Sequence, residues 1–103
     1  MAVVNLTENN FEQEVMRSDK PVLIDFFATW CGPCSMVSPI VDQIAEERSD
    51  LKVCKVDVDE QGELASQFGV SSIPMLVVVK NGKISAQSVG AMPKEKILEL
   101  VEK

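Results

Sequence analysis

The chain has 103 residues, the length of one small domain, and carries 10 Lys and Arg against 16 Asp and Glu, a formal net charge of −6. Hydrophobic residues make up 46% of it, too many for a disordered chain, and the acidic balance excludes nucleic-acid binding through a basic face and argues against a polybasic membrane patch. Histidine is absent, which excludes Ser-His-Asp and Cys-His catalysis and all zinc sites that use histidine.

The first half of the chain alternates strand-like and helix-like patterns. Residues 2–5 form a short apolar run that predicts a strand, and a helix capped by Thr7 is expected up to about residue 17. Residues 22–28 are a near-continuous apolar run, typical of a strand that is buried on both faces. Over residues 34–48 the apolar side chains recur on one helical face, and Pro39 inside this segment should kink the helix.

The middle of the chain adds one more strand and one more helix. Residues 52–59 alternate in character, so Cys54 shares one face of the expected strand with valines and Lys55 lies on the other face. A short helix follows over residues 60–68, and Gly69 is placed to end it.

The last part of the chain predicts a hairpin and a final helix. Residues 75–79 are a third apolar run, and Asn81-Gly82 after it is a strong signal for a tight turn into a partner strand over residues 83–89. Pro93 opens the last helix. The order β-α-β-α-β-α-β-β-α predicts one α/β domain over residues 1–103, in three layers around a mixed sheet with an antiparallel edge.

The chemistry is expected at Cys31 and Cys34, which are separated by Gly32-Pro33 where a strand passes into a helix. Three-residue spacing in a helical turn brings side chains to about 5–6 Å, close to what a disulfide needs. The helix N-terminus favours a thiolate at Cys31, because unpaired N–H groups and the positive end of the helix dipole point at its sulfur. Pro33 loses no hydrogen bond in the first turn, and Gly32 leaves the sulfur open to a bulky partner.

A cysteine pair of this kind serves as a structural disulfide, a metal site or a redox pair. The start of the chain lacks a secretory signal, and no apolar run approaches the roughly 20 residues of a membrane span, so we expect a cytoplasmic protein without a membrane anchor. A structural disulfide is disfavoured in that reducing compartment. A zinc site needs about four ligands, and only Cys54 remains, although a cluster bridging two chains stays conceivable. A dithiol–disulfide redox pair is therefore favoured, with no metal.

The string Phe26-Phe27-Ala28-Thr29-Trp30-Cys31-Gly32-Pro33-Cys34 resembles the active-site signature of the thioredoxin family. Matches continue along essentially the whole chain, at Asp25, Lys55, Ile73-Pro74, Lys80-Asn81-Gly82-Lys83 and Val89-Gly90-Ala91. The resemblance implies the thioredoxin fold, a three-layer α/β/α arrangement with a central mixed β-sheet.

The resemblance also implies a function, the reduction of protein disulfides. Cys31 would be the nucleophile and Cys34 the resolving thiol, and their exchange would leave a Cys31–Cys34 disulfide. A thioredoxin reductase would reset this disulfide with electrons from NADPH, or from ferredoxin in some lineages. The expected partners are that reductase and disulfide-containing substrate proteins, and the chain is expected to be a monomer that binds no cofactor itself. A binding module or scaffold that does not need the dithiol is the alternative.

Residues around the dithiol are expected to form a docking patch. A lone tryptophan is often a core residue, but by resemblance Trp30 is a surface platform against which substrates pack. The family has a cis proline at the position of Pro74, where the Ile73 backbone would pair with a substrate strand. Together the resemblance implies an apolar patch of Trp30, Gly32, Pro33, Ile73, Pro74, Gly90 and Ala91.

Asp25 stands alone within the apolar run 22–28 and is expected to be buried, with Lys55 as its nearest candidate partner. Burial raises the pKa of a carboxyl and a neighbouring lysine lowers it; we expect burial to dominate, because a lysine reaches water easily. The expected role of Asp25 is to accept the proton of Cys34, with Lys55 tuning it. Cys54 is read as a buried, inert thiol, with regulation as its minor alternative.

Three positions depart from the common pattern of the family. Ser35 stands where many members have a cation that favours the thiolate. Met75 stands where threonine is usual, so a more apolar groove is expected. Phe27 stands where many members have tryptophan, which should reduce the fluorescence change on reduction.

Overall fold

The computed structural model describes residues 3–103, and within that range no helix is long and apolar enough to cross a membrane. The elements in chain order are β1 (Val3–Asn5), the π-helical segment η1 (Glu12–Met16), β2 (Val22–Phe27), α1 (Gly32–Glu47), β3 (Lys52–Asp57), α2 (Gly62–Gln67), β4 (Met75–Lys80), β5 (Lys83–Val89) and α3 (Lys94–Val101). This order confirms the predicted alternation.

One five-stranded sheet runs through the molecule in the order β1-β3-β2-β4-β5. β1 and β2 are parallel to β3, whereas β4 is antiparallel to β2 and to β5. The sheet is mixed, as expected, but its antiparallel part begins one strand earlier than the hairpin edge that the sequence suggested. The central strands β2 and β4 are buried along nearly their whole length.

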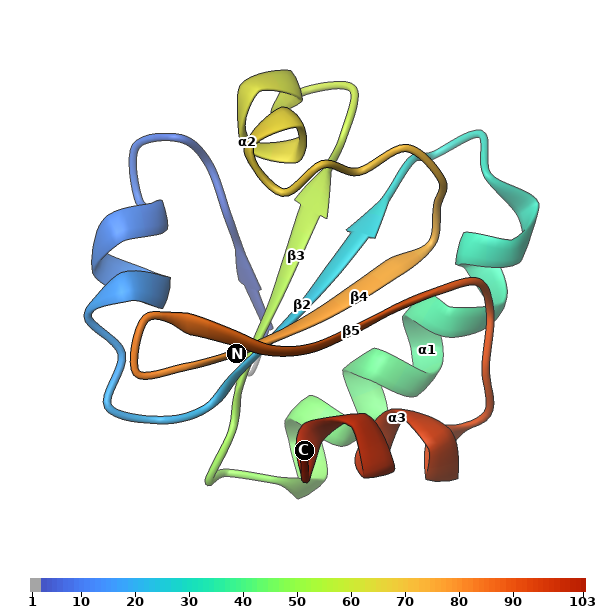
Figure 1. Ribbon diagram of the computed structural model, residues 1–103. Coiled ribbons are helices and arrows are strands. Elements are labelled where there is room, and N and C mark those ends of the chain that lie inside the picture. The colour runs from blue at the N-terminus through green and yellow to red at the C-terminus, as the bar shows by residue number, and fades with distance from the viewer. Residues whose placement is uncertain (1–2) are drawn as a thin grey trace.

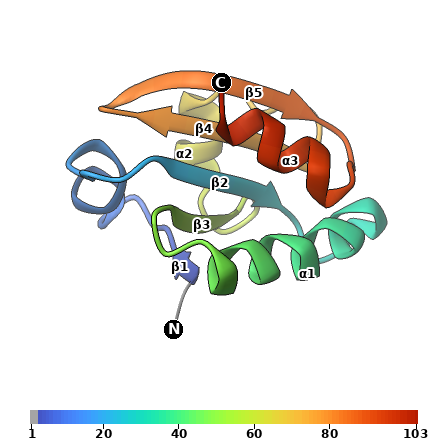
Figure 2. The same ribbon diagram turned by 90° about the horizontal axis from the view of Figure 1, so that it is seen from below.

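Helices cover both faces of the sheet, which makes the three layers (Figures 1 and 2). α1 and α3 cover one face, where Leu23 of β2 and Val53 of β3 pack against Val41 and Ile97 of the helices. η1 and α2 cover the other face, where Ile24 and Phe26 lie with the core that includes Val15 and Leu64. Alternate residues of β2 therefore enter two separate cores.

The element boundaries differ locally from the sequence prediction. The expected helix after Thr7 is shortened to the π-helical segment η1, although Thr7 does accept the N–H groups of Asn9 and Asn10 at 3.2 Å. α1 begins at Gly32, earlier than its apolar periodicity indicated, and runs through Pro39 as one helix. Gly69 has the positive φ of 65° expected of a residue that ends a helix. Ala2, predicted to start the first strand, lies outside the described residues.

Candidate active site

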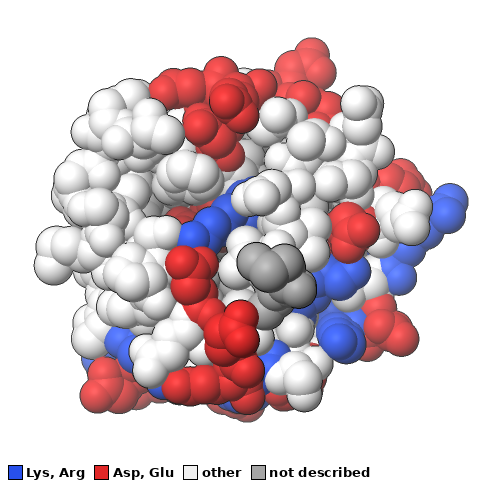
Figure 3. Space-filling view, turned by 180° about the vertical axis from the view of Figure 1, so that it is seen from behind, with Lys and Arg blue, Asp and Glu red and all other residues white. Residues whose placement is uncertain are grey.

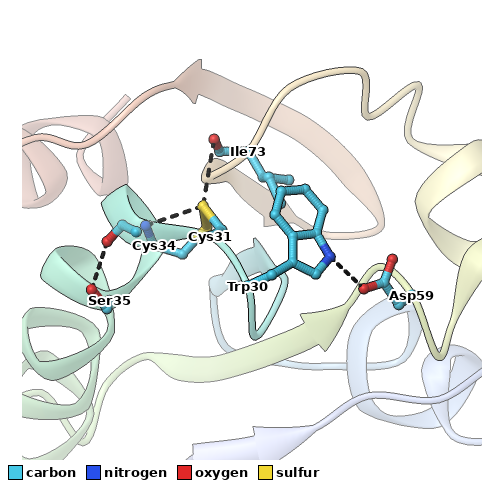
Figure 4. The surroundings of a disulfide bond; sticks show 7 residues. Trp30, Cys31, Cys34, Ser35, Asp59 and Ile73 are labelled. Carbon is cyan, nitrogen blue, oxygen red and sulfur yellow. Dashed lines mark hydrogen bonds between the residues drawn. A yellow bond between two sulfur atoms is a disulfide. The ribbon is translucent and has the colours of Figure 1, made fainter.

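The Cys31–Cys34 disulfide lies where β2 passes into α1, with Ala28 and a tight turn between the two elements. The Cys31 N–H donates to the Ala28 carbonyl oxygen at 3.2 Å, and Cys31 is the N-cap of α1 in an extended conformation. Cys31 and Cys34 form a disulfide with their Cα atoms 5.3 Å apart. The Cys34 N–H donates to the Cys31 sulfur at 3.2 Å, so the sulfur caps the helix (Figure 4).

The two sulfur-bearing residues differ more in their helix position than in their exposure. Cys31 is 7% exposed and Cys34 is 4% exposed, so Cys31 is less open than a freely accessible nucleophile. Gly32 and Pro33 between them are exposed, and a Cβ at Gly32 would meet no atom within 4 Å. The capped helix end therefore distinguishes Cys31, and the Gly32–Pro33 segment between the two cysteines is open to solvent.

Trp30 lies on the surface beside the dithiol and is 71% exposed, so the structure excludes its reading as a core residue. Its indole N–H donates to the Asp59 carboxylate at 2.7 Å (Figure 4). The sequence prediction missed Asp59, although it follows β3 at the edge where β2 also ends. Since the carboxyl ends of parallel strands lie at the same edge of a sheet, the position of Asp59 just after β3 indicated that it lies near the end of β2 and the dithiol.

The segment before β4 faces the dithiol from the other side. The Ile73–Pro74 peptide is cis, as the family resemblance implied, and the Ile73 carbonyl oxygen lies 3.9 Å from the Cys31 sulfur (Figure 4). Gly90 has a φ of 102°, and its N–H donates to the Pro74 carbonyl oxygen at 2.8 Å. This contact joins the loop after β5 to the segment before β4, next to Cys31.

The residues expected in the docking patch thus gather at one end of the sheet. Trp30 and Ala91 are exposed, Ile73 and Gly90 are half-buried, and Pro74 is buried beneath them. An apolar groove of about 320 Å³ continues from Ala91 to α1, lined by Met36, Val37, Ile40, Ala91, Met92 and Pro93. Seen from behind, the side that carries the start of α1 is nearly free of charged side chains (Figure 3).

Asp25 is buried as expected, 1% exposed, and neither of its carboxylate oxygens has a hydrogen-bond partner. Burial raises its pKa from 3.8 to about 6, against the opposing positive charge of Lys55 and with a smaller upward contribution from Asp42. Desolvation therefore dominates, as the sequence argument anticipated. The group changes its charge close to neutral pH.

Lys55 lies beside Asp25 and lowers its pKa, as expected, but its ammonium forms an ion pair with another carboxylate. The two residues are register neighbours on β3 and β2. The Lys55 ammonium, however, lies 2.7 Å from an Asp42 carboxylate oxygen and donates to the Ser38 hydroxyl at 2.6 Å. The strand register was readable from the sequence. The competing partners Ser38 and Asp42 follow Cys34 by four and eight residues on α1, a spacing that the sequence also shows.

A hollow of about 250 Å³ beside the disulfide is lined by Phe27, Ala28, Cys34 and Ser38, among others. The expectation that Met75 makes the groove more apolar is wrong. The Met75 side chain is 4% exposed and packs into the core under η1 and α2. Ser35 is exposed and donates to the Gly32 carbonyl oxygen at 2.6 Å, so it supplies no cation.

Cys54 is fully buried in the core under η1 and α2, and burial raises the pKa of its thiol to about 12. A thiol in that environment stays protonated and unreactive. Among residues 3–103, no group of three or more Cys, Asp or Glu side chains is arranged to hold a metal ion.

A mixed five-stranded sheet with helices on both faces, and a redox disulfide at the N-terminus of the helix after β2, define a thiol–disulfide oxidoreductase. The family profile of thioredoxin matches residues 2–103. The chain belongs to the thioredoxin family, and its activity is that of a protein-disulfide reductase with Cys31 and Cys34 as the redox pair.

Relatives support this assignment over more than nine-tenths of their length. "Thioredoxin 1" of Nostoc sp. is 48% identical over 103 residues, covering 99% of this chain and 96% of the relative. "Thioredoxin" of Bacillus subtilis is 47% identical over 104 residues, covering 100% and 98%. "Thioredoxin" of Pseudomonas aeruginosa is 41% identical over 101 residues, covering 97% and 94%.

Proposed function

We propose that reduction of a substrate disulfide runs in two exchange steps with separate roles for the two cysteines. In the first step the Cys31 thiolate attacks one substrate sulfur, the substrate disulfide breaks, and the released substrate thiolate takes a proton from water. In the second step Cys34 loses its proton and attacks the Cys31 sulfur. The bond between Cys31 and the substrate breaks, and the second substrate thiolate leaves and is protonated. The substrate gains two electrons, which the dithiol loses.

The position of Cys31 as N-cap of α1 is the observation that carries this assignment. The Cys34 N–H already donates to the Cys31 sulfur at 3.2 Å, and it would stabilise a thiolate there once the disulfide is reduced. The helix dipole adds to the same effect. Cys34 lies within the first turn, behind the capped end of the helix, which suits it to the second step.

Asp25 is the proposed proton acceptor for Cys34. Its pKa of about 6 suits a group that must take a proton near neutral pH and release it afterwards. The α1 helix that carries Cys34 packs over the sheet face that carries Asp25 and Lys55, and Lys55 tunes the acceptor from there. Gly32 and Pro33 keep the approach to the dithiol open.

The docking patch of Trp30, Gly32, Pro33, Ile73, Pro74, Gly90 and Ala91 is the proposed binding site for substrate proteins. Its support is the contacts that join these residues around the disulfide: the Ile73 carbonyl oxygen lies 3.9 Å from the Cys31 sulfur, and the Gly90 N–H donates to the Pro74 carbonyl oxygen at 2.8 Å. The Ile73 backbone would pair with an extended substrate segment beside the attacked sulfur.

The partners follow from the family. We infer that a thioredoxin reductase restores the dithiol with electrons from NADPH, or from ferredoxin in some lineages, and that the substrates are disulfide-containing proteins. The protein itself would act as a monomer in the cytoplasm without a bound cofactor. The full-length similarity to proteins named thioredoxin supports this setting.

The test is the reduction of insulin disulfides, followed as turbidity. With dithiothreitol as the electron source, the wild-type protein should accelerate precipitation many-fold over dithiothreitol alone, and NADPH with a bacterial thioredoxin reductase should replace dithiothreitol. Cys31→Ser should give no acceleration, and Cys54→Ala is the matched control that keeps it. A wild-type protein without any acceleration would refute the proposal and leave a scaffold function that does not need the dithiol.

A further inference from the structure

One stripe of α1 connects the dithiol to Lys55. Cys34, Ser38 and Asp42 are spaced four residues apart and therefore lie on one face of the helix. The stripe borders the buried face of α1 and contacts β3 through Lys55, which is opposite Asp25 in register. The stripe begins at the resolving thiol and ends at a carboxylate.

The Lys55 ammonium is held by this stripe and not by its register neighbour. It lies 2.7 Å from the Asp42 carboxylate and donates to the Ser38 hydroxyl at 2.6 Å. The Lys55 side chain is 13% exposed, whereas that of Asp42 is 55% exposed, so the lysine reaches from the interior toward the rim. Both contacts direct its positive charge toward α1.

Asp25 has no polar partner for either oxygen, although it lies beside a lysine. Its neighbour in register on β4 is the apolar Leu76, and α3 packs on this face with apolar residues. The carboxylate of Asp57, next in line on β3, accepts the N–H groups of Asp59 and Glu60 in the following turn. Two charged groups act on Asp25: Lys55 from β3 and Asp42 from α1. When the disulfide is reduced, the Cys34 thiol of α1 is a third titratable group on this side of the sheet.

We propose that Asp42 and Ser38 are positioning residues that hold the Lys55 ammonium against α1 and so keep it from pairing with Asp25. This inference rests on the proposed role of Asp25 as the proton acceptor. It adds the contacts that keep a positive charge away from Asp25 and so keep the carboxylate a stronger base.

The physical basis is competition between two carboxylates for one ammonium group. Asp42 is largely hydrated and stays ionised at little cost, whereas ionised Asp25 must give up its solvation. A lysine that paired with Asp25 would stabilise its charged form and make it a weaker base. With Lys55 occupied by Asp42 and Ser38, burial dominates and the pKa of Asp25 is raised to about 6.

The test measures the titration of the Asp25 carboxyl by ¹³C NMR in the full-length protein. In Asp42→Asn the pKa of Asp25 should fall from about 6 toward its ordinary value of 3.8. Asp42→Glu should restore the wild-type titration. Glu47→Gln is the matched control, because it removes one charge and one ion pair, with Lys94, from the same helix, and should leave the Asp25 titration unchanged.

A double-mutant cycle shows whether Asp42 acts through Lys55. In a Lys55→Gln background, Asp42→Asn should shift the Asp25 titration much less than it does in the wild type. Ser38→Ala should act in the same direction as Asp42→Asn with a smaller shift, and Ser38→Thr should retain the wild-type titration. Equal shifts by Asp42→Asn with and without Lys55 would overturn the positioning role and leave only direct charge repulsion.

The pH profile of single-turnover insulin reduction separates this inference from the proposed function. A carboxyl with a pKa of about 6 is about one-tenth ionised at pH 5, so the inflection of the profile should move to lower pH in Asp42→Asn together with the Asp25 titration. A titration that moves while the rate profile does not would refute Asp25 as the proton acceptor and keep the positioning of Lys55. A titration that does not move would refute the positioning.

Discussion

The two faces of the sheet are built from the same strands but differ in chemistry. Under η1 and α2, the alternate residues of β2 and β3 are apolar except for Cys54, which is fully buried. Under α1 and α3, the same strands present Asp25 and Lys55, and the disulfide lies at the end of this face. One face contains a thiol with a pKa of about 12, and the other carries a carboxyl with a pKa of about 6.

The difference shows that location, more than residue type, decides reactivity in this fold. Cys54 and Cys31 are both mostly shielded from water, but only Cys31 has a helix N-terminus directed at its sulfur. The face under η1 and α2, which we call the inert face, stabilises the fold by burying apolar side chains. That stability offsets the cost of the unpaired buried carboxyl of Asp25 on the other face.

Removing either cysteine of the redox pair is the strongest way to test the contrast. Cys31→Ser should abolish insulin reduction and form no mixed disulfides, whereas Cys34→Ser should accumulate them because no resolving thiol remains. Mass spectrometry of the trapped species would identify substrates. Iodoacetamide at neutral pH should label reduced Cys31 first and leave Cys54 unlabelled in the folded protein. Preferential labelling of Cys34 would reverse the assigned roles.

Truncation in the inert core should lower stability without altering the chemistry. Phe26 is fully buried and its ring lies 5.1 Å from that of Phe68. Phe26→Ala should reduce the free energy of unfolding by about 3–5 kcal/mol, from lost burial and the cavity left behind. Urea titration measures the loss, and the insulin assay at low temperature should keep most of its rate. An equal loss of rate in a fully folded variant would mean that the two faces are coupled.

Replacing Asp25 should stabilise the protein at pH 8. The folded pKa of about 6 exceeds the unfolded value near 3.8, so the unfolded chain releases its proton first and stability falls as pH rises between these values. The full penalty above pH 6 is about 3 kcal/mol. Asp25→Ala in the oxidised protein should therefore gain about 1–3 kcal/mol at pH 8, after the cost of a small cavity, and little or nothing near pH 4.

Urea titrations at pH 4 and pH 8 decide this prediction, and the same variant should resolve mixed disulfides more slowly. Loss of stability at pH 8 would mean that Asp25 is a structural pair partner, and its assignment as proton acceptor would lose its main support.

Changing Cys54 should have the smallest effect. Cys54→Ala removes one buried sulfur atom, so a loss of about 1 kcal/mol in unfolding free energy is expected, with the rate of insulin reduction unchanged. A rate that falls several-fold while stability is kept would give Cys54 the regulatory role that its burial argues against.

Much of the fold was predictable because local patterns and tertiary structure agree. The apolar run of β2, the Asn81-Gly82 turn and the buried stripe of α3 all appear where the sequence places them. The direction of β4 was not predictable, because an apolar strand looks the same in either orientation and only packing of the whole sheet decides it. The π-helical form of η1, whose one buried residue is Val15, was not predictable from local patterns either.

The active site divides in a similar way. The dithiol and the burial of Asp25 follow from short-range patterns, and the structure confirms both. The ion-pair partner of Lys55 does not follow from short-range patterns, because a flexible lysine side chain can reach carboxylates on several elements. The side chain of Met75 was misplaced for a simpler reason: the resemblance gave its position, but strand alternation directs it to the opposite face.

Trp30 is the only tryptophan of the chain, and it lies on the surface in contact with Asp59 beside the disulfide. Its emission therefore reports on the end of the sheet that carries the disulfide and the proposed docking patch. It should respond when a partner covers the indole or when Asp59 changes charge. It should change little in solvent contact on unfolding, since the ring is already 71% exposed. Binding experiments with this protein need no added dye, whereas unfolding is better followed by circular dichroism.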